Sequence, residues 1–261
     1  MRKDYHMHST VVQAPERLEA FIENALVHGV QEICVTDHMP LLGDRASDRI
    51  PAGRVGEYCD AVRRLAKQYE ERISVKLGIE VDYHPSIHDQ IRAVLQAGQY
   101  DHILGSSHLH AIQGLDLFSG TVTRNEYAAA MFENTLAAIR TGWFSAIPHL
   151  DMHRWIFSLP QRFPLIDDGY EEKRHWDRIQ EILELIRDTG MRLEINPHFA
   201  VKDLSLEKIY PRVPILERAL DMGIRFCYGS DAHKPEEVAT LLDQLREHPV
   251  YGKAIAHWEN E

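Results

Sequence analysis

Short apolar runs alternate with longer amphipathic stretches about seven times along the chain, and this alternation restricts the fold more than any other feature. The apolar runs have the length and the residue types of buried strands. The stretches between them repeat apolar residues at helical spacing. Strands that alternate with helices usually pair in parallel, because each crossover returns the chain to the same end of the sheet. We therefore expect an α/β fold.

Seven strands are expected in this order: Tyr5–Ser9, Glu32–Thr36, Val75–Tyr83, His102–Ser107, Phe144–Pro148, Arg192–Asn196 and Ile224–Gly229. The helices expected between and after them are Glu16–His28, Val55–Arg72, Ile87–Ala97, a helix that reaches Arg140, Glu171–Asp188, Pro214–Met222 and a last helix that opens at Pro235. Thr123 and Glu126 have the spacing of a capping box. Seven such units favour a closed, TIM-like barrel over an open sheet. No linker or low-complexity segment interrupts residues 1–261, which predicts a single domain.

Composition narrows the possible partners. The formal net charge of −11 argues against nucleic acid, which normally requires a basic surface. The sequence contains no run of about 18 apolar residues, so we expect no membrane span. The N-terminus lacks a signal-peptide pattern, and Cys34, Cys59 and Cys227 are scattered and odd in number. We expect a cytoplasmic protein; the oligomeric state is left open.

Side chains that commonly bind metals lie at or near the carboxyl ends of six of the seven expected strands. They are His6, His8, His38, Glu80, His108, His149, Asp231 and His233. In a parallel barrel these strand ends meet on one face, where active sites lie. Six histidines and two carboxylates without cysteine suit two or three Zn, Mn or Fe ions. The alternative is that these residues cap turns, which suits a single member better than the whole set.

Within this set, His6 and His8 are two residues apart on an extended segment, so both imidazoles point to the same side. Glu80 is central in the order and is the best candidate for a carboxylate that bridges two metal ions. Asp37 and Asp151 lie close to histidines and could orient their rings. Turn capping explains these two aspartates equally well.

Four residues are candidates for substrate contacts. Arg49, Arg154 and Lys202 lie in loops where they could bind a phosphate group, and His198 follows the sixth strand. The alternative for each charged residue is simple solvation. Other histidines divide into three groups: His84, His110 and His153 lie near the expected site, His102 is expected in the core, and His28, His175, His248 and His257 are expected in solvent.

These motifs resemble the PHP (polymerase and histidinol phosphatase) family, over nearly the whole chain and in order. The matching motifs are His6-x-His8-Ser9, Thr36-Asp37-His38, Gly78-Ile79-Glu80-Val81-Asp82, Gly105-Ser106-Ser107-His108, His149-Leu150-Asp151 and Gly229-Ser230-Asp231-Ala232-His233. The runs Glu80–Pro85 and Ser230–Val238 are most similar to the histidinol-phosphatase branch.

The resemblance implies a distorted (β/α)7 barrel with two or three divalent ions that hydrolyses phosphate esters. In its histidinol-phosphatase branch the substrate is L-histidinol phosphate. By matching motifs, one ion would be held by His6, His8, Glu80 and Asp231, and a second by Glu80, His108 and His149. His38 and His233 would help to hold a third. Glu80, Asp231 and His233 are the expected catalytic residues.

The chain departs from the family pattern at two places. The first motif usually has a further histidine where this chain has Ala14, so that Gln13 or Glu16 would substitute or the third ion would bind weakly. A basic pair after the sixth strand is altered to Val201-Lys202, although Arg49 matches a basic position. Two other functions stay open: hydrolysis of an ester, lactone or amide, or of another phosphate ester, at the same metals, and metal or ligand binding without catalysis.

Overall fold

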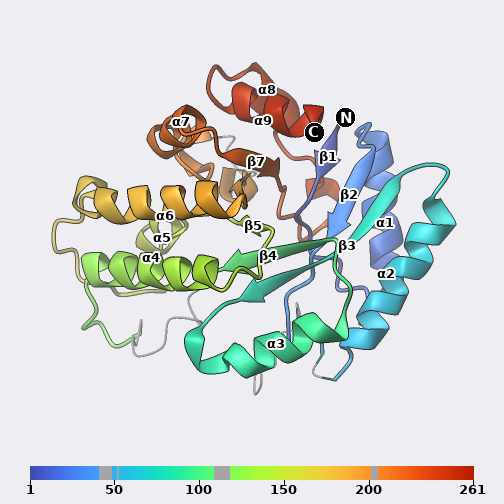
Figure 1. Cartoon of the computed structure of the whole chain (residues 1–261), viewed down its shortest axis with the longest axis horizontal. Coiled ribbons are helices and arrows are strands. Elements are labelled where there is room, and N and C mark those ends of the chain that lie inside the picture. Colours follow the sequence, from blue (N-terminus) through green and yellow to red (C-terminus); the bar gives the residue numbers. More distant parts are fainter. Residues whose placement is uncertain (41–48, 52, 109–117, 201–204) are drawn as a thin grey trace.

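Seven parallel strands run in sequence order around the molecule in the computed structural model, which describes residues 1–40, 49–51, 53–108, 118–200 and 205–261 (Figure 1). Each strand pairs with the next, from β1 to β7. Their bounds are β1 Lys3–Asp4, β2 Glu32–Val35, β3 Ser74–Asp82, β4 His102–Ser106, β5 Ala146–Ile147, β6 Arg192–Ile195 and β7 Arg225–Tyr228.

The first and last strands approach each other and nearly close the barrel. The Tyr5 amide donates to the Tyr228 carbonyl at 2.9 Å. Beyond β1 and β7, the Asp231 amide donates to the His6 carbonyl at 2.8 Å, and Met7 forms a parallel bridge with Ala232. The predicted barrel is therefore confirmed, with its seam between the two segments that carry the first and last sequence motifs.

Helices surround the sheet (Figure 1). They are α1 Pro15–Val27, α2 Val55–Tyr69, α3 His88–Ala97, α4 Arg124–Arg140, α5 His153–Phe157, α6 Trp176–Thr189, α7 Val213–Asp221, α8 Leu242–Glu247 and α9 Tyr251–Asn260. Short 3-10 turns cover Pro85–Ile87, Glu172–His175, His198–Ala200, Leu206–Lys208 and Pro235–Glu237. Helices α4 and α6 lie side by side, and α9 lies next to β7 and the N-terminus.

Local sequence explains how several helices begin and pack. The predicted capping box is present, because the Glu126 amide donates to Thr123 Oγ1 at 3.1 Å and the Thr123 amide donates to the Glu126 carboxylate at 2.8 Å. Helix α2 buries the apolar stripe that its spacing predicts, including Val62 and Leu65. Burial of each such side chain stabilises the fold by about 1.5–3 kcal/mol.

The sequence-based boundaries are wrong at the C-terminal end. Pro235 opens only a 3-10 turn, because Val238 is extended and Ala239 and Leu241 both adopt a φ of +57°. These conformations break the helical hydrogen-bond pattern, so two separate helices, α8 and α9, follow in place of one. Strands β1 and β5 are also shorter than predicted. Among the described residues, no helix combines the length and the apolar character needed to span a membrane.

Candidate metal centre

All eight predicted ligands lie together at the carboxyl-terminal mouth of the barrel. Glu80 belongs to β3, and the others lie in the segments that directly follow strands: His6 and His8 after β1, His38 after β2, His108 after β4, His149 after β5, and Asp231 and His233 after β7. Six of the eight are buried, and His108 and His233 are half-buried. The parallel barrel explains this convergence, because all its strands end on the same face.

Glu80 lies at the centre of the group. One carboxylate oxygen, Oε1, is 3.1 Å from His149 Nε2 and 3.3 Å from His108 Nε2. The other oxygen, Oε2, is 2.7 Å from His38 Nδ1 and 3.5 Å from the Nε2 atom of both His6 and His8. Each oxygen therefore faces its own set of imidazoles, as a carboxylate shared by two cations must.

The pair between Glu80 and His38 indicates that this centre is more than a hydrogen-bond network. Glu80 Oε2 and His38 Nδ1 are only 2.7 Å apart, yet neither atom forms a hydrogen bond with acceptable geometry, and both are buried. Buried polar atoms rarely stay unsatisfied. Imidazole nitrogens and carboxylate oxygens aimed at a common space are the donor set that binds Zn and similar ions.

Asp231 completes a second group with the first motif. Its Oδ1 atom is 3.0 Å from His8 Nε2 and 3.6 Å from His6 Nε2, and these two ring nitrogens are 3.1 Å apart. Asp231 and His149 both adopt positive φ angles, +54° and +37°. Such a backbone is costly for residues other than glycine, and it tends to occur where a side chain must be aimed at a functional site.

A third group of histidines forms although this chain has Ala14 where the family usually has a further histidine. The ligand atoms of His8, His38 and His233 lie within 4.8 Å of one another. Ala14 serves as the N-cap of α1, and the Gln13 side chain donates to the Arg49 carbonyl at 2.5 Å. The imidazoles of His8, His38 and His233 therefore form a group that could hold a metal ion.

The charges at the centre reinforce one another. Burial would by itself lower the pKa of His6, but the carboxylates of Glu194, Asp231 and Glu80 outweigh it and raise that pKa well above its ordinary value. Burial would likewise raise the pKa of Glu80, but His108, His38 and His6 lower it well below the ordinary value. The carboxylate therefore stays ionised, and a bound cation would compete with protons for the imidazoles.

Glu194, in β6, was not among the predicted site residues. It is fully buried, and its Oε1 atom is 2.7 Å from His6 Nδ1. Its Oε2 atom accepts hydrogen bonds from the His149 amide at 3.2 Å and from Asn196 Nδ2 at 3.0 Å. Glu194 therefore fixes the His6 ring so that Nε2 faces Glu80 and Asp231. The sequence feature that could have indicated Glu194 is its place as a carboxylate within an apolar strand, which it shares with Glu80.

Asp82 has a similar role on the other side of the centre and was also missed. One of its oxygens bonds to His108 Nδ1, and the other forms an ion pair with Arg49. This orients His108 Nε2 toward Glu80. Asp82 also fixes one edge of the Arg49 guanidinium at the mouth of the site.

Asp37 and Asp151 do not orient imidazoles in the described structure, so that interpretation is wrong. Asp37 accepts hydrogen bonds from the backbone amides of Ser9, Thr10 and Val11, which is turn capping. Asp151 accepts from the Arg212 amide and forms an ion pair with Arg154 at 2.8 Å. Both aspartates shape the loops around the centre instead.

The predicted substrate residues fall into different surroundings. A hollow of about 330 Å³ at the centre is lined by Arg49 and His198 together with four of the metal-ligand candidates. An adjoining cavity of about 810 Å³ shares His198 and His233 and is lined by Arg154. Trp155, Phe199 and Arg162 also line the central hollow and were not predicted. Lys202 lies outside the described residues, as does His110.

Arg154, in α5, is already bonded to the loop that carries residues 205–210. Its guanidinium donates to the carbonyls of Glu207 at 2.6 Å and Ile209 at 2.9 Å, and its Nε atom lies 2.8 Å from Asp151. These contacts hold the loop that carries residues 205–210 against α5. Contact with a substrate stays a prediction for this residue.

The remaining histidines differ in their surroundings. The prediction of a solvated His175 is wrong, because its side chain is buried and bonds to Asn125 at 2.9 Å. His153 is also buried, and its Nε2 atom is 2.6 Å from the Tyr170 hydroxyl. His84 accepts a hydrogen bond from the Ser86 amide and so caps a turn. His102 is buried as predicted, but its Nε2 atom has no hydrogen-bond partner.

Known proteins resemble this chain over most of its length. A protein of Deinococcus radiodurans named "probable histidinol-phosphatase" is 28% identical over 261 residues, which covers 94% of this chain and 91% of that protein. The histidinol-phosphatase of Bacillus subtilis is 25% identical and covers 94% of this chain and 98% of its own. The Lactococcus lactis histidinol phosphate phosphatase, solved with zinc, L-histidinol and phosphate, superposes with a TM-score of 0.71 at 20% identity, and 93% of each chain is covered.

The family follows from a match that covers most of the chain. The model of the PHP domain family matches residues 4–198, from the start of the first histidine motif to the residue that follows β6 and Pro197. That range contains six of the eight converging ligand candidates, and the barrel places the other two, Asp231 and His233, beside them. The chain belongs to the PHP domain family.

Proposed function

We propose that this protein is a metal-dependent phosphatase that hydrolyses L-histidinol phosphate to L-histidinol and inorganic phosphate. The observation that carries the proposal is the position of Glu80, whose two oxygens face separate sets of imidazoles. Such a shared carboxylate suits a site with several ions, which is a common arrangement for phosphate-ester hydrolysis. The substrate is supported by the names of the relatives that match at nearly full length.

We further propose two or three divalent ions, of Zn, Mn or Fe. His6, His8, Asp231 and Glu80 would hold one, and Glu80, His108 and His149 a second. His8, His38 and His233 would hold a third, and three imidazoles suffice for a site that keeps an open position. Bound ions would supply positive charge for the phosphoryl oxygens and lower the pKa of a water to about 7.

The chain's own residues would orient the reacting groups. Glu80 and Asp231 stay ionised at neutral pH, because the surrounding histidines lower the pKa of both carboxyl groups against the opposing effect of burial. Burial lowers the pKa of His233, so its ring is neutral. His233 Nδ1 is 3.0 Å from the Asp231 carbonyl, which can only accept, so Nδ1 carries the proton. His233 Nε2 is left with a lone pair at the edge of the hollow, available to a cation or to a proton.

Substrate binding would use the two adjoining hollows. Arg49 and His198 line the end next to the ligand candidates, where a phosphate group would bind. Trp155 and Phe199, whose rings stack at 4.7 Å with an interplanar angle of 18°, line both hollows and would contact the leaving group. A flat aromatic wall suits a small molecule that contains an imidazole ring.

The test combines metal reconstitution with a substrate panel. Protein stripped by a chelator is reloaded separately with Zn, Mn and Fe, and phosphate release is measured from L-histidinol phosphate and p-nitrophenyl phosphate. A carboxyl ester and a lactone complete the panel. We expect turnover of L-histidinol phosphate that is lost in His6→Ala and Asp231→Asn but kept in His257→Ala, a control on the outer surface of α9. If the metal-loaded protein hydrolyses the ester or lactone but no phosphate ester, the proposal is wrong.

A further inference from the structure

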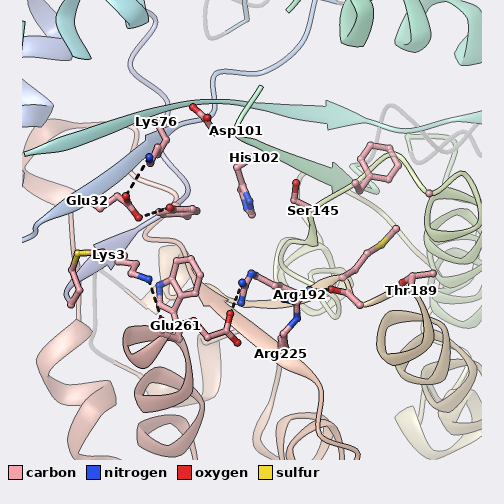
Figure 2. Close-up of a pocket in the computed structure, with 17 residues that line it drawn as sticks. Lys3, Glu32, Lys76, Asp101, His102, Ser145, Thr189, Arg192, Arg225 and Glu261 are labelled. Atoms are coloured by element: carbon pink, nitrogen blue, oxygen red, sulfur yellow. Dashed lines mark hydrogen bonds and ion pairs between the residues drawn. The ribbon is translucent and has the colours of Figure 1, made fainter. Parts of the chain in front are cut away.

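A third hollow lies at the opposite end of the barrel, where the strands begin. Its volume is about 720 Å³, and it is lined by the first residues of several strands and by Trp258 of α9 (Figure 2). Lys3 begins β1, His102 begins β4, Arg192 begins β6 and Arg225 begins β7. None of these residues belongs to the metal centre.

Lys3 places a buried cation beside this hollow. The residue is only 6% exposed to solvent. Among the described residues, its ammonium group contacts the Trp258 carbonyl at 3.5 Å and the Trp258 ring at 4.5 Å, and no carboxylate lies within ion-pair distance. A charge that has lost its hydration needs a counterion or several hydrogen bonds. Among the described residues, Lys3 has only one weak hydrogen bond, to the Trp258 carbonyl, and one cation–π contact with the Trp258 ring.

His102 presents an unsatisfied polar atom to the same space. The residue is 4% exposed, its Nε2 atom has no hydrogen-bond partner, and Figure 2 shows the ring pointing into the hollow. Burial, followed by the nearby charge of Arg192, lowers the pKa of His102 to about 3, so the ring is neutral at pH 7. A neutral imidazole still carries one N–H donor, which can lie on Nε2.

Three acidic residues line the hollow, and each already has hydrogen-bond or ion-pair partners: Glu32, Asp101 and Glu261. Glu32 accepts hydrogen bonds from the Tyr5 hydroxyl at 2.5 Å and from Ser74 at 2.9 Å, and lies 3.6 Å from Lys76. Glu261 forms an ion pair with Arg192 at 2.5 Å. Asp101 accepts a hydrogen bond from the Leu77 amide at 2.9 Å. Against these three acidic side chains the hollow is lined by four cationic ones, Lys3, Lys76, Arg192 and Arg225, so it keeps a small surplus of positive charge although the whole chain carries −11.

We propose that this hollow binds a small oxyanion between the Lys3 ammonium group, His102 Nε2–H and the Arg192 guanidinium. These donors approach from β1, β4 and β6, so one anion with several oxygens would join three strands around the barrel. A metal ion is disfavoured by the surrounding cations. The shared ligand chemistry is a compact group of carboxylate, sulfate or phosphate type, and the test separates these three.

The experiment titrates the metal-loaded full-length protein with sulfate, phosphate or acetate at constant ionic strength set by sodium chloride. Binding is followed by tryptophan fluorescence, since Trp258 lines the hollow, and by the thermal unfolding midpoint. We expect saturable binding of at least one anion that weakens tenfold or more in Lys3→Met and in His102→Phe. Lys253→Met removes the same charge from an exposed position of α9 and should bind as the wild type does.

Several outcomes overturn the proposal. One is a response that chloride reproduces, and another is an affinity that is unchanged in both Lys3→Met and His102→Phe. A third is a response lost in Asp231→Asn but kept in Lys3→Met, which would assign the anion to the metal centre. Circular dichroism and metal content confirm that each variant is folded. Lys3→Met should keep the wild-type turnover, so anion binding and the proposed phosphatase activity are tested separately.

Discussion

The two ends of the barrel differ in the charge of the ligand that we propose for each. At the carboxyl-terminal end, six imidazoles and two carboxylates converge, and each oxygen of Glu80 lies within 3.5 Å of at least two ring nitrogens. At the amino-terminal end, Lys3 and Arg192 lie over Trp258, beside a histidine that burial keeps neutral. The first end offers electron pairs to cations, and the second offers donors to an anion.

The carboxylates next to the two groups of residues also differ in what they contact. At the metal centre, Glu194 and Asp82 sit behind the ligand rings and fix how His6 and His108 are turned. At the other end, Glu32 and Glu261 pair with other cations, and no carboxylate of the described residues lies within ion-pair distance of Lys3. A barrel can therefore place two sites of opposite charge on one set of strands, because the strand ends are independent of one another.

The largest effect is expected for Glu80→Gln. The change keeps the shape of the side chain but removes the charge that faces all the imidazole sets, so metal content should fall. Turnover should drop by roughly 10²–10³-fold or more, the scale seen when one group that stabilises transition-state charge is lost. Metal analysis and phosphate release check this. Wild-type turnover in Glu80→Gln would contradict a bridging role.

The next effect is expected for Glu194→Gln, which removes the acceptor that holds His6 Nδ1–H. Metal affinity or activity should fall by about 10–100-fold, as for other residues that orient a ligand ring. Competition with a chromophoric chelator measures the affinity. Glu184→Gln is the matched control, since Glu184 is exposed on α6. If both variants bind metal equally well, Glu194 has no orienting role.

Much of the fold follows from the sequence, because apolar runs and helical spacing are local. The strand from Arg192 and the helix from Val55 begin at their predicted residues. The C-terminal segment is different, since the positive φ angles at Ala239 and Leu241 come from tertiary packing at residues with no turn preference. Local propensity alone therefore predicts one helix where the structure has two.

The sequence predicts the ligand candidates of the site but not the carboxylates that orient them. His38 and His149 directly follow apolar strands, so their position at the mouth is set by topology. Glu194 lies within a strand, and its partner His6 is 188 residues away, so their contact depends on the closed barrel. In the sequence, Lys3 and His102 gave no sign of the hollow that they line, because it forms only when β1, β4 and α9 meet.

The neutrality of His102 can be tested through the pH dependence of stability. Its folded pKa of about 3 lies below the ordinary value, so between pH 6.5 and 3 the unfolded chain binds a proton that the folded state refuses. Stability from this group is therefore present above pH 6.5 and is lost as the pH falls, by about 2 kcal/mol at pH 5. Urea unfolding of chelator-treated protein at pH 8 and pH 5 should show a smaller acid loss in His102→Phe, and equal losses would contradict the assignment.

The smallest effect is expected for the stability of Lys3→Met in buffer that contains only chloride as the anion. Replacing a buried charge by an apolar side chain of similar length removes an attraction to Trp258 worth about 0.5–1 kcal/mol and also removes the cost of burying the ammonium group. The unfolding free energy should therefore change by no more than about 1 kcal/mol. Urea unfolding measures this, with Lys253→Met as the control. A loss of several kcal/mol would show that Lys3 holds the barrel together by itself, and the amino-terminal end would then differ from the metal centre in being structural.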